Sequence, residues 1–136
     1  MQPIALDTNA YVAFKRGDAD VIAVIQRAPR ILLPVTVLGE LLAGFAAGQR
    51  EAANRKELNA FMQSPRVTPA QLTTVTADRY ALVYAALRRA GRPIPTNDMW
   101  IAATALEHGA ALLTLDAHFE AVSGLRVGKA PENFLP

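Results

Sequence analysis

The sequence predicts an α/β fold in which a parallel sheet is covered by helices on both faces. Short, uninterrupted apolar runs alternate with longer segments whose apolar residues recur at helical spacing. Continuous apolar strands are typical of parallel sheets, because helices bury both of their faces. The length of 136 residues fits one domain over residues 1–136, and a hydrophobic content of 51% can supply its core.

In the first half of the chain, local signals mark where each helix begins and ends. Asp7 or Thr8 can cap a helix that follows the first strand, and Gly17 ends it. Thr36 is expected to cap the helix after the second strand. The elements predicted here are a strand at 4–6, helices at 8–16 and 19–27, a strand at 31–33, and helices at 37–47 and 50–62.

The second half continues the alternation. A long helix through Ala90 is expected to start at Thr76 and to stop at Gly91. The next helix, capped by Thr96 or Asn97, is apolar on nearly every side and should therefore be buried. The elements predicted here are a short strand at 66–67, helices at 77–90 and 97–108, a strand at 111–115, a helical piece from about residue 118, and a strand at 125–127.

Composition excludes several kinds of site and compartment. The chain has no cysteine, and its two histidines, His108 and His118, are too few for a histidine zinc site. A metal would be held by oxygen, which favours Mg²⁺ or Mn²⁺. No signal peptide is visible, and the most apolar stretch, 35–47, contains Glu40 and is too short to cross a bilayer. We therefore expect a cytoplasmic protein without a membrane segment.

Four carboxylates stand out, and each has an ordinary structural explanation. Asp7 can be a helix cap, Asp98 can complement the helix dipole from a first turn, and Asp116 can form a turn after a strand. Glu40 is harder to explain, because its helix is apolar around it and an unpaired buried carboxylate is costly. Considered one at a time, the three aspartates favour the structural explanation.

Considered together, the four acids favour a metal site. In a parallel α/β fold, the carboxyl ends of strands share one edge with the starts of the following helices. Asp7 and Asp116 follow strands, Asp98 lies in the first turn of a helix, and Glu40 lies about one turn into another. Four clustered carboxylates raise one another's pKa unless a cation neutralises them. Outside this cluster, eight acidic residues remain against fourteen Lys and Arg residues, so the rest of the chain is net positive. Such a balance suits a polyanionic substrate or partner.

Four segments of the chain form a recognisable ordered set: ALDTN (5–9), PVTVLGELLAG (34–44), PTNDMWIAATALEHG (95–109) and LLTLDAHF (112–119). In these segments and their order the chain resembles PIN domains, and in particular the VapC toxins of type II toxin–antitoxin systems. The resemblance covers nearly the whole chain. It implies a three-layer sandwich with a five-stranded parallel sheet and metal-dependent hydrolysis of RNA, leaving a 3′ hydroxyl and a 5′ phosphate.

The resemblance also assigns roles to individual residues. Asp7 and Asp98 would be direct ligands of Mg²⁺ or Mn²⁺, with Asp116 as a third metal-site acid, and Glu40 would complete the catalytic pocket. Support through hydrogen bonds is implied for Thr8, Asn9 and Thr114, with His118 near the site. The implied partners are an RNA substrate, a second copy of the chain in a homodimer, and an antitoxin. Leu41, Leu42 or Phe45 are candidates for an exposed apolar interface.

Two other functions remain open on the residues alone. A magnesium-dependent phosphatase could use Asp7 as its nucleophile, although such enzymes carry a second Asp where this chain has Asn9. The other alternative is a non-catalytic binding module with a decayed PIN-like site. The presence of all four acids argues against such decay. The arginines Arg88, Arg89 and Arg92 are either solvated helix residues or phosphate contacts, and the same holds for Lys15 and Arg16.

Overall fold

The computed structural model describes residues 1–136 and contains one sheet of five parallel strands in the order β3-β2-β1-β4-β5. The predicted parallel α/β fold is confirmed. The strands are β1 (Ile4–Leu6), β2 (Ile31–Pro34), β3 (Val67–Ala70), β4 (Ala111–Leu113) and β5 (Val127–Gly128). The helices are α1 (Thr8–Lys15), α2 (Ala19–Arg27), α3 (Val35–Ala47), α4 (Glu51–Met62), α5 (Thr74–Arg89) and α6 (Thr96–Glu107), with 3-10 turns η1 (Ala117–Ala121) and η2 (Pro131–Asn133).

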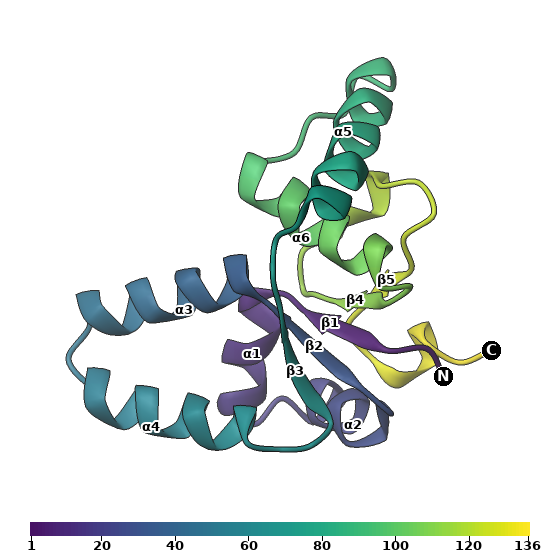
Figure 1. Cartoon of the computed structure of the whole chain (residues 1–136). Coiled ribbons are helices and arrows are strands. Elements are labelled where there is room, and N and C mark those ends of the chain that lie inside the picture. Colours follow the sequence, from purple (N-terminus) through teal and green to yellow (C-terminus); the bar gives the residue numbers. More distant parts are fainter.

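Helices cover both faces of the sheet (Figure 1). The chain runs from β1 to β2 to β3 through α1–α4, and then returns past β1 through α5 and α6 to reach β4. Crossovers between parallel strands are right-handed, so this reversal puts α1–α4 on one face and α5–α6 on the other. The strand order changes direction between β1 and β4, where ligand sites of such folds lie.

The core follows the apolar runs of the sequence. β1 and β4 lie at the centre of the sheet and every residue in both is buried. On α6, six residues from Met99 to Ala105 are buried, as the apolar character of this helix predicted. No helix combines the length and the apolar character that crossing a membrane would require.

Three helix starts differ from the predicted caps. α3 and α6 each follow a proline directly, at Pro34 and Pro95, and have no side-chain cap, because the fixed φ of proline already suits a helix start. Thr36 therefore caps nothing. α5 is capped by Thr73, and Thr76 completes a reciprocal capping box with it. All three helices still begin within a few residues of the expected positions.

The strand ends also differ from the prediction. β4 stops at Leu113 and not at 115, because the backbone N–H of Leu115 donates to the side chain of Asn9 at 3.0 Å and so leaves the ladder. β5 lies at Val127–Gly128 and not at 125–127, and β3 extends to Ala70. The early end of β4 places Thr114 and Asp116 in an irregular segment that turns toward β1.

Candidate active site

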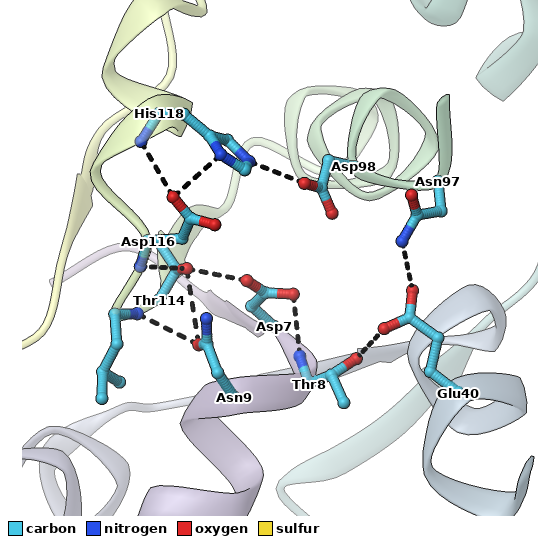
Figure 2. Close-up of polar contacts among 10 residues, drawn as sticks. Asp7, Thr8, Asn9, Glu40, Asn97, Asp98, Thr114, Asp116 and His118 are labelled. Carbon is cyan, nitrogen blue, oxygen red and sulfur yellow. Dashed lines mark hydrogen bonds and ion pairs between the residues drawn. The ribbon is translucent and has the colours of Figure 1, made fainter. Parts of the chain in front are cut away.

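All four predicted acids line one cleft of about 720 Å³ at the carboxyl edge of the sheet. Asp7 follows β1, and Asp116 lies beyond the end of β4, on the two sides of the change in strand order. Glu40 comes from the second turn of α3, and Asp98 from the first turn of α6. Figure 2 shows these side chains arranged around a common opening, with Asp7 at its base.

Asp7 is the buried member of the cluster. Its side chain accepts hydrogen bonds from the Thr8 backbone N–H at 2.8 Å and from the Thr114 hydroxyl at 2.7 Å. Burial raises the pKa of Asp7, these two hydrogen bonds lower it, and the charges of Asp98 and Glu40 raise it again, with a net rise from 3.8. Asp7 is therefore a helix cap and a member of the charged cluster at once.

Asn9 and Thr114 join α1 to the segment after β4. Asn9 accepts the N–H of Leu115 at 3.0 Å, and the Thr114 hydroxyl accepts the N–H of Asp116, also at 3.0 Å. The same hydroxyl donates to Asp7. Thr114 thus fixes both the orientation of Asp7 and the backbone that carries Asp116 (Figure 2).

Glu40 is held from two sides. The Thr8 hydroxyl donates to Oε2 of Glu40, and the Asn97 amide donates to Oε1 at 2.8 Å. Thr8 belongs to α1 and Asn97 to α6, so these bonds link three helices across the mouth of the cleft. The polar residues around Glu40 explain how a carboxylate is tolerated on an otherwise apolar helix.

Asp98 and Asp116 meet at His118. The ring nitrogens of His118 lie 2.6 Å from Oδ2 of Asp98 and 2.9 Å from Oδ1 of Asp116, so the ring is within hydrogen-bond distance of both carboxylates. Asp116 also accepts the backbone N–H of His118 at 3.1 Å, so it does form the expected turn. Burial raises the pKa of Asp98, contacts with His118 lower it, and Glu40 and Asp116 raise it, with a net rise above 3.8.

The donor atoms fit a hard divalent cation. Ligand atoms of Asp98, Asp116 and His118 lie within 4.8 Å of one another. Asp7 lies outside this tightest group, yet it is close enough for the charge of Asp98 to raise its pKa. Carboxylate oxygens predominate in the cleft and no thiolate is present, which is the donor set that Mg²⁺ and Mn²⁺ prefer.

The structure brings together every site residue named from the sequence, His118 included, and it adds Asn97. Thr8, Asn9 and Thr114 bond to Glu40, to Leu115 and to Asp7 respectively. Asn97 was expected as a helix cap and instead holds Glu40. His118, which was expected near the site from its position beside Asp116, lies between two of the acids. Among the arginines, Arg16 lines the cleft, whereas Arg88, Arg89 and Arg92 do not.

Comparison with known proteins identifies the family. The model of the PIN domain matches residues 4–125, and the chain belongs to this family. Within it, the chain is similar to the VapC ribonucleases. It is 34% identical over 93 residues to ribonuclease VapC4 of Mycobacterium tuberculosis (68% of this chain, 72% of the relative), and 30% identical over 127 residues to ribonuclease VapC11 of that organism (88% and 91%).

A solved structure agrees with this assignment. The structure of VapBC-1 from nontypeable Haemophilus influenzae superposes with a TM-score of 0.80 at 26% identity, covering 93% of this chain and 96% of the other. The four acids and the residues that hold them all lie within the residues matched by the family model.

Proposed function

We propose that this chain is a VapC-type endoribonuclease that hydrolyses RNA phosphodiesters with a divalent ion, Mg²⁺ or Mn²⁺, held by Asp7, Asp98 and Asp116. One observation carries the proposal. Four carboxylates from distant parts of the sequence converge in one cleft at the carboxyl edge of the sheet. The chain belongs to a family whose members include named ribonucleases.

A divalent ion bound there supplies a Lewis acid for the phosphate oxygens and lowers the pKa of a water molecule. In the hydrolysis, the oxygen of water bonds to phosphorus while the bond to the 3′ oxygen breaks, which leaves a 3′ hydroxyl and a 5′ phosphate. Burial is the main cause of the raised pKa values of Asp7 and Asp98, and the neighbouring acids raise them further. A bound cation would offset that added negative charge, which agrees with this assignment.

The protein residues orient the carboxylates for this chemistry. Asp7 is fixed by the Thr8 amide and the Thr114 hydroxyl, so its carboxylate cannot rotate away from the cleft. Each oxygen of Glu40 already accepts one hydrogen bond, and its remaining lone pairs are available to hold a proton of water in the cleft. His118 positions Asp98 relative to Asp116.

The phosphatase alternative is less well supported. It requires an acid two residues after Asp7, and the residue there is Asn9, whose oxygen is engaged with the backbone of Leu115. Asn9 connects α1 to the chain after β4, and its amide has no acidic proton with which to protonate a leaving group. The decayed binding module is disfavoured because all four acids converge in one cleft.

The partners follow from the same family assignment. We propose a cytoplasmic homodimer that is inhibited by a VapB-type antitoxin, with a cationic antitoxin side chain entering the acidic cleft. Leu42 and Phe45 are half-buried on α3 and can contribute apolar contact area, whereas Leu41 is buried in the core. Light scattering of the purified chain tests the dimer. RNase inhibition by the antitoxin across a magnesium titration tests entry into the cleft, which requires competition with magnesium.

The decisive experiment is an RNase assay on the purified chain. End-labelled RNA is incubated with MgCl₂, with MnCl₂ or with a chelator, and the chemical nature of the new ends is determined. We expect cleavage only with a divalent ion, with 5′ phosphate products, and none from Asp98→Asn. Hydrolysis of para-nitrophenyl phosphate without RNA cleavage would identify a phosphatase instead. If neither substrate is cleaved and manganese does not bind by calorimetry, the chain is a binding module.

A further inference from the structure

Arg16 is the one basic side chain that lines the acidic cleft. It lies at the end of α1, where Gly17, with a φ of +89°, turns the chain away, so Arg16 stands at the rim. It is exposed and makes no ion pair and no side-chain hydrogen bond, although the cleft beside it holds several carboxylates. A charged side chain of this kind has all its donors free for a ligand.

Two further hollows adjoin the cleft, and they differ in charge. One, of about 530 Å³, lies between α1 and the α3–α4 pair and shares Val12 and Arg16 with the cleft. It carries Lys15, Arg16 and Arg50 against a single acid, Glu57. The other hollow, beside η1, shares Leu115 and Asp116 with the cleft and carries one cation, Lys129, against two acids.

This difference in charge favours one of the two paths for a polyanion that extends beyond the cleft. When the scissile phosphate of an RNA strand occupies the acidic site, the neighbouring phosphates come within reach of the adjoining hollows. The hollow beside η1 repels them, whereas the hollow between α1 and α4 attracts them. Lys15 is paired with Glu57 at 3.4 Å, so Arg16 and Arg50 are its two cations without a partner.

Resting on the proposed function, we infer that Arg16 and Arg50 bind the RNA backbone next to the scissile phosphate and guide the strand into the groove between α1, α3 and α4. The groove lies in the region where Figure 1 shows α1 facing the α3–α4 hairpin. Both arginines would position the RNA strand, and neither takes part in holding the proposed metal ion. Phosphate contacts of this kind set register and affinity and carry no sequence information directly.

The test measures cleavage kinetics of Arg16→Ala and Arg50→Ala on an RNA that the wild-type chain cleaves. We expect KM to rise about tenfold in each variant with kcat nearly unchanged, and the dependence of log kcat/KM on log [KCl] to flatten by about 0.7 per lost contact. Arg16→Lys should retain most of the salt dependence, because it keeps the charge. A purely structural role would not change the salt dependence.

Two matched controls sharpen the result. Arg27→Ala removes the same charge from α2, outside all three hollows, and Lys129→Ala removes the only cation of the rival hollow. Both should behave as wild type. Melting temperatures establish that each variant folds, and Arg16→Gln replaces Arg16→Ala if the latter does not.

The outcomes separate this inference from the proposed function. Absence of cleavage by the wild-type chain contradicts the proposed function itself. Cleavage by the wild type, with Arg16→Ala and Arg50→Ala indistinguishable from Arg27→Ala, overturns the inference alone. If the two variants bind RNA normally but escape inhibition by the antitoxin, the groove serves the protein partner, which also overturns it. A raised KM for Lys129→Ala alone would indicate that the strand passes through the hollow beside η1, which also contradicts the inference.

Discussion

The cleft has two walls that hold their carboxylates by different means. On the inner wall, made by β1 and the chain after β4, Asp7 is 5% exposed and receives hydrogen bonds from neutral donors, Thr8 and Thr114. On the outer wall, made by α6 and the start of η1, Asp98 and Asp116 are held by the ring of His118. The side chain of Asp116 is 42% exposed.

This difference separates what the fold fixes from what a ligand can adjust. The inner wall is set by the register of the sheet, in which Leu6 pairs with Leu113, so Asp7 and Thr114 are brought together by backbone pairing. The outer wall depends on side-chain contacts between a helix and a turn. We therefore expect substitutions of the inner wall to affect stability as well as activity, and those of the outer wall to affect mainly the response to metal.

The largest effect is expected on catalysis, where the two walls should behave alike. Asp7→Asn and Asp98→Asn should each lower kcat for RNA by about a thousandfold, since several kcal/mol of metal-dependent stabilisation is lost while the shape of the side chain is kept. Single-turnover cleavage at saturating magnesium measures the loss. An active Asp98→Asn variant would restrict the chemistry to the inner wall.

The next effect concerns stability and should appear on the inner wall alone. Thr114→Val removes the hydroxyl that bonds to Asp7, and should destabilise the protein by about 1–3 kcal/mol, because a buried carboxylate oxygen loses its donor. Thr104→Val is the matched control, since that buried hydroxyl bonds only to the carbonyl of Trp100 in its own helix. Urea denaturation of both variants provides the comparison; equal losses would mean that the Thr114–Asp7 bond has no special importance.

A pH effect should involve both walls. The pKa values of Asp7 and Asp98 are raised above 3.8, so the folded protein binds these protons more tightly than the unfolded chain. Their contribution to stability is fully present below 3.8 and is lost as the pH rises through the raised values. In a chelator, the Asp7→Asn/Asp98→Asn double variant should therefore gain stability over wild type as the pH approaches neutrality. A constant difference across this range contradicts the assignment.

The smallest effect is expected at Asp116. In a chelator, Asp116→Asn should raise the melting temperature slightly, because repulsion within the cluster falls while the asparagine oxygen can still accept the N–H of His118. The gain in melting temperature on adding manganese should be smaller than in wild type. A lower melting temperature in the chelator would mean that Asp116 is mainly a turn residue.

The sequence predicted the positions of the acids because strand ends and helix starts are local features. Asp7 follows an apolar run and Asp98 lies in the first turn of a helix, and in a parallel sheet both features lie at the same edge. Glu40 was identifiable because its helix offers little polar surface. The predictions that Thr36 and Thr76 cap helices at their N-termini were wrong. Pro34 precedes α3 directly, and Thr73 caps α5.

The contacts between distant residues could not be predicted in this way. Asn97 at a helix start reads as a cap, and only the approach of α3 to α6 gives it Glu40 as a partner. His118 follows a turn-forming Asp, and its contact with Asp98 depends on how α6 packs over β4. Arg16 has the same local signature as any basic residue in a last helical turn, and only the shape of the cleft distinguishes it from Arg27.

The central position of β1 has a consequence for biosynthesis. β1 is made first, but its neighbour β4 lies 107 residues further along the chain, and the hydroxyl that fixes Asp7 arrives with it. A nascent chain that has left the ribosome only as far as α5 holds Asp7 and Glu40 but lacks the opposite wall of the cleft. Synthesis must therefore pass Asp116 before both walls of the cleft can form.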